Sequence, residues 1–203
     1  MPKLDRSNYE GGREQVYVKH YLLEKYLSSW GYIIGGSEWD SLVFVDGFAG
    51  PWGSKHEGFA DASFGIAVRT LNEVIDGLFE SRQIAISGLC VFVEKKPKPF
   101  AKLNDFAKEN STNNVRAIAL KGRFIENIRT IDKHVAAIGE NPFKFVFLDQ
   151  KGWAATPMEN LRPFLRKRSC EVLFNLMTSF LTRFVERTAE NLVTTNYLVG
   201  LEF

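Results

Sequence analysis

The sequence predicts an α/β protein built on a doubly wound, mostly parallel sheet. Strand-like runs that are apolar throughout alternate with segments whose apolar residues recur at helical spacing. Strands that are hydrophobic on both sides are typical of parallel sheets, which helices cover on both faces. Right-handed crossovers between such strands give the doubly wound arrangement. At 203 residues, the chain is long enough for one domain of this kind.

The N-terminal part of the chain is expected to form one amphipathic helix and a loop. Apolar residues at helical spacing predict the helix over residues 14–30. The loop or short appendage follows over 31–41. We therefore divide the chain into an N-terminal helix-and-loop appendage, 1–41, and a main domain, 42–203, which together form one globular unit.

In the first half of the main domain, strands and helices alternate. The β-branched and apolar residues 42–46 form the first strand, and apolar residues at helical spacing predict a helix over 60–79. A second apolar run predicts a buried strand over 89–94, and a helix is expected over 99–108. A turn with two asparagines then introduces a shorter strand over 115–120.

The same alternation continues in the second half. A helix over 124–138 is closed by a glycine, and an apolar run predicts a strand over 143–149. A proline precedes the next helix, 158–167. The last strand is expected over 171–177 and the last helix over 180–192.

Composition excludes several classes of protein. A net charge of only +2 does not indicate a nucleic-acid binder, and no apolar run is long enough to cross a membrane. Cys90 and Cys170 lie in apolar runs and are expected to be small buried side chains. The histidines have no partners at metal-ligand spacing, so no metal site is expected. Without a signal-peptide core, we expect a cytoplasmic protein.

Three expected strands end in an acid, and one of these acids precedes a glycine-rich loop. Asp46, Glu94 and Asp149 occupy these positions, and the loop follows at 47–50. The carboxyl ends of parallel strands meet at one edge of a sheet, where such folds bind ligands. Glycines allow the backbone to approach a ligand closely. The residues alone leave two interpretations open: a nucleotide-type cofactor site, or a structural turn with helix-capping acids.

Four segments in combination resemble the three-Cys-motif partner family, whose members resemble class I S-adenosylmethionine-dependent methyltransferases. The segments are the helix with Lys19, His20, Leu23, Tyr26, Leu27 and Trp30, then 45–51, then 147–149 with Gly152, then 171–177. The resemblance runs from about residue 15 to residue 180. It implies a Rossmann-like fold and association with a protein that carries a three-cysteine motif. With two cysteines, this chain would be the partner of that protein.

The resemblance also implies roles for individual residues in binding S-adenosylmethionine. Glu94 would hold the ribose hydroxyls of the cofactor. Two further sets of residues would lie under the methionine moiety and beside the adenine, respectively: Asp46, Gly47, Ala49 and Gly50, and Gly122, Arg123 and Phe124. Asp149 would be the catalytic acid that polarises the methyl acceptor.

The sequence departs from the family pattern after this acid. Amino-methylating enzymes carry a proline after the acid, whereas Gln150 follows Asp149 here. The resemblance implies a methyltransferase whose acceptor is unidentified. The missing proline favours an alternative, a non-catalytic binding or assembly partner that has kept the fold. A nicotinamide oxidoreductase is a third hypothesis, which the long spacing between the glycine loop and Glu94 disfavours.

Lys19 and His20 on the first helix, and a basic cluster late in the helix before the last strand, have two interpretations each. Lys19 is expected to be solvated, although it could reach an anionic group of a cofactor, and His20 is expected to be a core or groove histidine rather than a base. The basic cluster could contact the phosphates of a nucleic acid, or form the solvated end of a helix. It comprises Arg162, Arg166, Lys167 and Arg168.

The C-terminal part of the chain is short for a class I methyltransferase. Members of that class usually add two more strands, so we expect the sheet to lack them and to expose an edge. Self-association or binding of a partner chain is therefore expected through residues 171–203.

Overall fold

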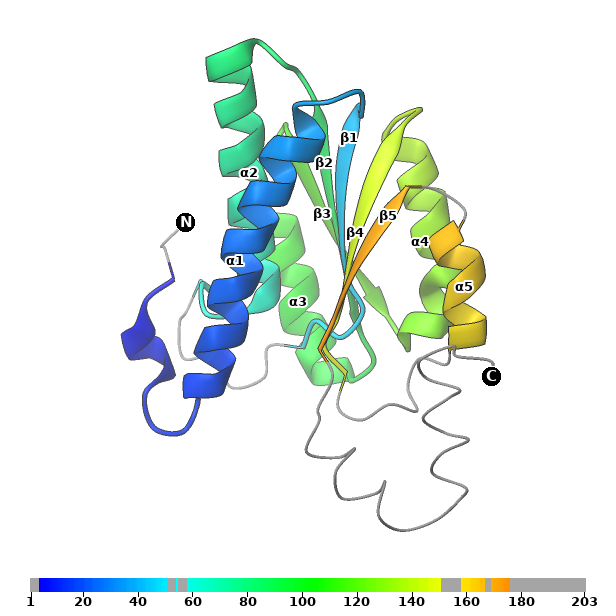
Figure 1. Ribbon diagram of the computed structural model, residues 1–203. Coiled ribbons are helices and arrows are strands. Elements are labelled where there is room, and N and C mark those ends of the chain that lie inside the picture. The colour runs from blue at the N-terminus through cyan, green and yellow to red at the C-terminus, as the bar shows by residue number, and fades with distance from the viewer. Residues whose placement is uncertain (1–3, 51–53, 55–57, 151–157, 167–168, 176–203) are drawn as a thin grey trace, which may run out of the picture.

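A computed structural model describes residues 4–50, 54, 58–150, 158–166 and 169–175 of the protein. These residues form a five-stranded sheet in which all neighbouring strands are parallel, in the order β3-β2-β1-β4-β5 (Figure 1). The strands are Ser41–Asp46 (β1), Ser87–Glu94 (β2), Val115–Lys121 (β3), Pro142–Leu148 (β4) and Cys170–Phe174 (β5). The doubly wound, Rossmann-like α/β fold expected from the sequence is confirmed.

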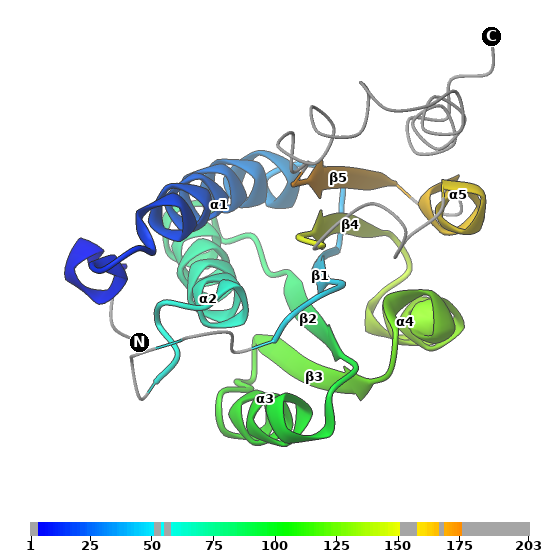
Figure 2. The ribbon, with the colours of Figure 1, turned by 90° about the horizontal axis from the view of Figure 1, so that it is seen from below.

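Helices cover both faces of the sheet. Figure 2 shows α1, α2 and α3 on one face, and α4 and α5 on the other. The helices are Glu14–Gly35 (α1), Ser63–Arg82 (α2), Pro97–Glu109 (α3), Phe124–Ile138 (α4) and Met158–Arg166 (α5), preceded by a 3-10 helix, Arg6–Tyr9 (η1). Because both faces are covered, the central strands are predominantly apolar, and the one lysine within β4, Lys144, is buried with its ammonium group donating to the carbonyl oxygen of Phe164 at 2.7 Å.

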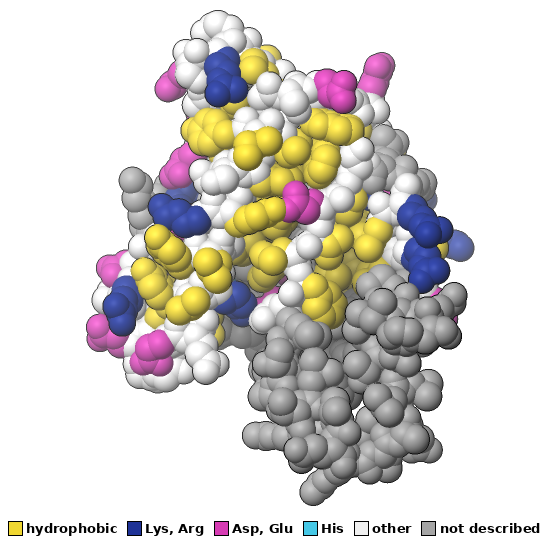
Figure 3. Space-filling view, in the orientation of Figure 1, with side chains coloured by type: hydrophobic (Ala, Val, Ile, Leu, Met, Phe, Trp, Pro, Cys, Tyr) yellow, Lys and Arg dark blue, Asp and Glu magenta, His cyan; other side chains and the backbone are white. Residues whose placement is uncertain are grey.

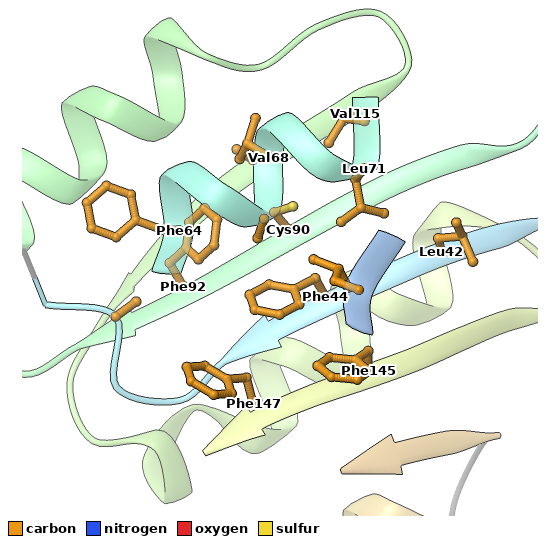
Figure 4. Close-up of a cluster of buried hydrophobic side chains, with 14 of the residues drawn as sticks. Leu42, Phe44, Phe64, Val68, Leu71, Cys90, Phe92, Val115, Phe145 and Phe147 are labelled. Atoms are coloured by element: carbon orange, nitrogen blue, oxygen red, sulfur yellow. The ribbon is translucent and has the colours of Figure 1, made fainter. Parts of the chain in front are cut away.

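The core has two halves, one on each face of the sheet. Successive residues of β1 alternate between them: Leu42 and Phe44 belong to the half beneath α1, α2 and α3, and Val43 and Val45 to the half beneath α4 and α5. This alternation is the period of two that any strand imposes on its side chains. In the first half, the rings of Phe44 and Phe145 stack with their centroids 5.9 Å apart (Figure 4).

The first helix is longer than predicted, because two glycines that suggested a loop are helix contact positions. A Cβ atom at Gly31 would lie 3.0 Å from Cγ1 of Val74, and one at Gly35 would lie 2.8 Å from Cδ1 of Leu78. Both neighbours belong to α2. The glycines thus let α1 and α2 approach closely, and the expected loop over 31–41 begins only after Gly35.

Several sequence predictions concern residues outside the described ranges. These are the last helix over 180–192, most of the segment 171–203 expected to mediate association, and two members of the basic cluster, Lys167 and Arg168.

At the start of α2, Gly65 lies so close to the backbone of Phe59 that we expect no side chain to be tolerated at this position. A Cβ atom at Gly65 would lie 2.2 Å from the carbonyl oxygen of Phe59. Gly65→Ala should therefore lower the free energy of unfolding by roughly 1–3 kcal/mol through overpacking, as measured by urea denaturation.

The matched control for this variant is Gly77→Ala in the same helix. Its Cβ would meet the terminal hydroxyl of Tyr32, a side chain that can move aside. Because alanine favours the helix over glycine, the control should be neutral or stabilising by up to about 1 kcal/mol. Equal losses of stability in the two variants would contradict the proposed contact.

Candidate functional site

The three strand-end carboxylates lie at one edge of the sheet, as predicted. In the parallel register, Asp46 pairs with Phe92 of β2 and with Phe147 of β4. Glu94 and Asp149 each lie two residues further along the neighbouring strands, which is roughly 7 Å. The candidate site is therefore centred on the end of β1, with one carboxylate on either side.

Asp46 is the buried centre of this edge. Its side chain accepts hydrogen bonds from the backbone N–H of Phe48 at 2.9 Å and from the hydroxyl of Ser63 at 2.6 Å. Burial raises the pKa of Asp46 to about 7, and the nearby charge of Asp149 adds to this, whereas the hydrogen bonds and the charge of Lys19 act in the opposite direction. Asp46 therefore ties the loop after β1 to the start of α2.

All the backbone N–H groups of the loop at 47–50 donate hydrogen bonds inside the protein. Gly47 and Ala49 donate to strand ends on either side of β1, and the other two donate within the loop. The bonds are Gly47 N to Phe147 O at 3.1 Å, Phe48 N to Asp46 Oδ1 at 2.9 Å, Ala49 N to Val93 O at 3.0 Å and Gly50 N to Phe48 O at 2.9 Å. The loop does not present these donors to a ligand.

Two residues of the predicted cofactor loop have packing roles. A Cβ atom at Gly47 would lie 2.9 Å from Cδ2 of Leu148 and 3.1 Å from the ring of Phe124. The side chain of Ala49 is buried in the core beneath α1, α2 and α3. The requirement for a glycine at position 47 thus arises from the core, although the backbone of the loop remains at the site. Gly50 is half-buried at the end of the described loop.

Glu94 and Gly122 join the ends of β2 and β3. The carboxylate of Glu94 is buried and accepts the backbone N–H of Lys96 at 2.6 Å. The backbone N–H of Gly122 donates to the carbonyl oxygen of Glu94 at 3.1 Å. Gly122 has a φ of +126°, a conformation that favours glycine. The structure thus brings these two predicted cofactor residues together.

The other two residues expected beside an adenine point in different directions. Arg123 is exposed, and its backbone N–H donates to the carboxylate of Glu126 at 2.9 Å, which caps α4. The ring of Phe124 is buried in the core and packs edge-on against Phe164, with centroids 6.0 Å apart. A contact between the Phe124 ring and a ligand would require this packing to change.

Lys19 is paired with Asp149, so the expectation of a solvated lysine is wrong. Its ammonium group forms an ion pair with Oδ2 of Asp149, and both side chains are 25% exposed. The amide of Asn175 donates to Oδ1 of the same carboxylate at 2.6 Å. Asn175 was missed in the sequence, because the strand expected over 171–177 contains it, whereas β5 ends at Phe174. Its polar side chain within an apolar run is the signal that could have marked the end of the strand.

His20, the neighbour of Lys19, is buried, as predicted. Its Nδ1 lies 3.0 Å from the hydroxyl of Tyr9. Burial, assisted by the charge of Lys19, lowers the pKa of His20 to about 4, so the ring is neutral at physiological pH. The contact joins η1 to α1, and nothing about it indicates a catalytic base.

Other predicted sites remain without structural support. Arg162 and Arg166 are exposed on α5, as a solvated helix face requires. Within the described ranges, no three His, Cys, Asp or Glu side chains are placed to hold a metal ion, and no helix is long and apolar enough to span a membrane.

No protein-family model, curated protein or solved structure matches the chain. What the site can do must therefore be judged from its own residues. The edge carries three carboxylates around a loop whose donors are already used, and Lys19 is paired with one of them. Such an arrangement suits a ligand that carries positive charge and hydroxyl groups, because carboxylates accept hydrogen bonds from both.

The opposite pKa shifts of Asp46 and His20 predict opposite effects of pH on stability. A raised carboxyl pKa stabilises the folded protein at low pH, and this contribution is lost as pH rises from 3.8 to about 7. A lowered histidine pKa stabilises the folded protein above 6.5, and this contribution is lost as pH falls toward about 4. Between these limits the two contributions oppose each other.

Single variants should reveal each contribution separately. In Asp46→Asn the free energy of unfolding should increase with pH between about 4 and 6.5, because the His20 contribution remains. In His20→Gln it should decrease over the same range. Each slope is at most about 1.4 kcal/mol per pH unit, the value for one proton, relative to a flatter wild type. Urea denaturation across this range measures the slopes, and two variants with the same slope would contradict the assignment.

Proposed function

We propose that the chain binds S-adenosylmethionine at the carboxyl edge of the sheet and is a methyltransferase-like protein of the three-Cys-motif partner type. The observation that carries this proposal is the combination of three strand-end carboxylates with a loop whose backbone N–H groups all donate hydrogen bonds within the protein. The ligand carries a sulfonium cation and two ribose hydroxyls, and carboxylates can interact with both groups. Its methyl acceptor is not identified.

The same observation disfavours a nicotinamide dinucleotide. The pyrophosphate of a dinucleotide needs free N–H donors from the glycine loop and the helix after it. Here the N–H groups of residues 47–50 all bond within the protein, and the carboxylate of Asp46 occupies the space between the loop and Ser63. A doubly negative group at this position would face a carboxylate.

Each residue at the edge has a proposed task. Glu94 accepts hydrogen bonds from the ribose hydroxyls, and Asp46 keeps the loop in the conformation that receives the methionine moiety. Asp149, held by Asn175, orients the acceptor for in-line attack on the methyl group that the cofactor supplies. Association with a three-cysteine-motif protein belongs to the same proposal and rests on the sequence resemblance.

Ligand-induced stabilisation tests the cofactor class. S-adenosylhomocysteine should raise the melting temperature of the wild-type protein by mass action, and NAD should not. Gly50→Val should abolish the shift by blocking the approach of the ligand to the loop. Glu94→Ala should weaken binding by about 1–3 kcal/mol, since buried hydroxyls lose their acceptor.

Glu80→Ala, an exposed acid on α2, is the matched control for Glu94→Ala and should leave the shift unchanged. A wild-type protein that is stabilised by NAD but not by S-adenosylhomocysteine would overturn the proposed function.

A second candidate function, assembly without catalysis, is favoured by an exposed apolar surface. Figure 3 shows hydrophobic side chains gathered over α1 and β5. On α1, Val18 is 55% exposed, Leu22 58% and Ile33 70%, and Val172 on β5 is 38% exposed. Tyr26 bridges the two elements by a hydrogen bond from its hydroxyl to Glu171. We propose a second copy of the chain as the occupant, because β5 is the last strand of the described sheet and adjoins this surface.

Light scattering at micromolar concentration tests this surface. The wild-type protein should self-associate, and the double variant Leu22→Lys with Ile33→Lys should be monomeric, because lysines on a docking surface must be desolvated. Ala136→Lys, at an exposed position of α4 on the opposite face of the sheet, is the control. A monomeric wild type would remove the assembly candidate.

A further inference from the structure

The ion pair between Lys19 and Asp149 joins α1 to the end of β4 at the candidate site. Both partners are a quarter exposed, so a ligand that enters the site can reach them. Asp149 is also held by Asn175 at 2.6 Å, whereas the ammonium group of Lys19 is at the end of a flexible side chain. Of the two partners, Lys19 is therefore the one that can change its contact while the other stays in place.

Lys19 lies at the edge of the sheet that also carries Asp46. Its partner Asp149 is two residues beyond Phe147, the residue of β4 that pairs with Asp46. Two arginines close to this end of the molecule are engaged elsewhere: Arg13 pairs with Asp61 at 3.0 Å and Arg69 with Glu24 at 3.2 Å. Lys19 is thus a cation that the described structure pairs with one of the three strand-end carboxylates.

We infer that Lys19 is the residue that recognises the α-carboxylate at the amino-acid end of the ligand, and that it leaves Asp149 to do so. This inference rests on the proposed function, since it presupposes an adenosyl ligand with an amino-acid end. In the free protein, both oxygens of Asp149 are engaged, one by Lys19 and one by Asn175. When Lys19 moves to the ligand, Asp149 remains held by Asn175 and regains an oxygen that can accept a hydrogen bond from the methyl acceptor.

The exchange couples the two halves of the site. An acceptor meets Asp149 without its lysine partner once the ligand has drawn Lys19 away, so binding of the ligand favours binding of the acceptor. No new charge is buried in the process, because one carboxylate replaces another beside the same ammonium group. The acid that stays behind is partly exposed and remains solvated.

Calorimetric titration with three ligands tests the inference. S-adenosylhomocysteine has the complete amino-acid end, its decarboxylated analogue keeps only the ammonium group, and 5′-methylthioadenosine has neither. Lys19→Met should weaken S-adenosylhomocysteine by about tenfold to a hundredfold, the range for a hydrogen bond to a charged group. The affinities of the other two ligands should change by less than about threefold, and Lys19→Arg should restore most of the loss.

Asp149→Asn provides a second, oppositely directed test. It breaks the same ion pair but leaves Lys19 free, so S-adenosylhomocysteine should bind as tightly as to the wild type, or more tightly. If Lys19→Met weakens all three ligands equally, or if Asp149→Asn weakens S-adenosylhomocysteine as much as Lys19→Met does, the ion pair only holds α1 in place and the inference is wrong. A wild-type protein that binds none of the three ligands would instead remove the proposed function, and the inference with it.

In the wild-type protein alone, the preference for S-adenosylhomocysteine over 5′-methylthioadenosine should decrease as salt is raised, because only the first ligand makes charged contacts that salt screens. A preference that is independent of salt would contradict a role for Lys19 whether or not the variants fold.

Discussion

The candidate site depends on the hydrogen bonds that satisfy the buried carboxylate of Asp46. An acid at the end of a central strand, enclosed by neighbouring strands and a helix, would be strongly destabilising without partners. The N–H of Phe48 and the hydroxyl of Ser63 supply them, and in doing so they fix the loop after β1 and the first turn of α2. Glu94 and Asp149 then lie on either side of this centre, each two residues beyond the partner of Asp46 on the neighbouring strand.

The hydrogen bonds made by the loop at 47–50 also determine which ligands suit the edge. A glycine loop can serve as an anion cradle only if its N–H groups are free, and this loop closes on itself and on the ends of β2 and β4. The strand-end carboxylates remain as hydrogen-bond acceptors at this edge. Lys19 offsets part of their charge in the free protein. Because Lys19 is paired with Asp149, a ligand that draws Lys19 away would change the surroundings of the carboxylate on the acceptor side of the site.

The architecture could be predicted from the sequence because the period of the apolar residues is a local property. Every strand of the described sheet and all five helices lie close to their predicted positions, and α4 has the predicted bounds. The end of α1 could not be predicted from local preferences. Gly31 and Gly35 disfavour a helix in isolation, and only the contact with α2 explains their presence there.

The site was predicted less completely, because its contacts join residues that are distant in the chain. The three acids could be found at strand ends, but the pairing of Lys19 with Asp149 spans 130 residues and has no local signature. Phe124 is the reverse case: the resemblance implies a place beside a ligand, and the structure adds that its ring packs in the core against Gly47 and Phe164. Sequence patterns identified the edge, and the packing of α1 and α4 determined which side chains reach it.

A crystal structure of the protein with S-adenosylhomocysteine would test the central claim most directly. We expect the ligand at the carboxyl edge of the sheet, with its ribose on Glu94 and its amino-acid end beside the loop at 47–50. A ligand bound elsewhere on the molecule, or a ribose without contact to Glu94, would contradict it.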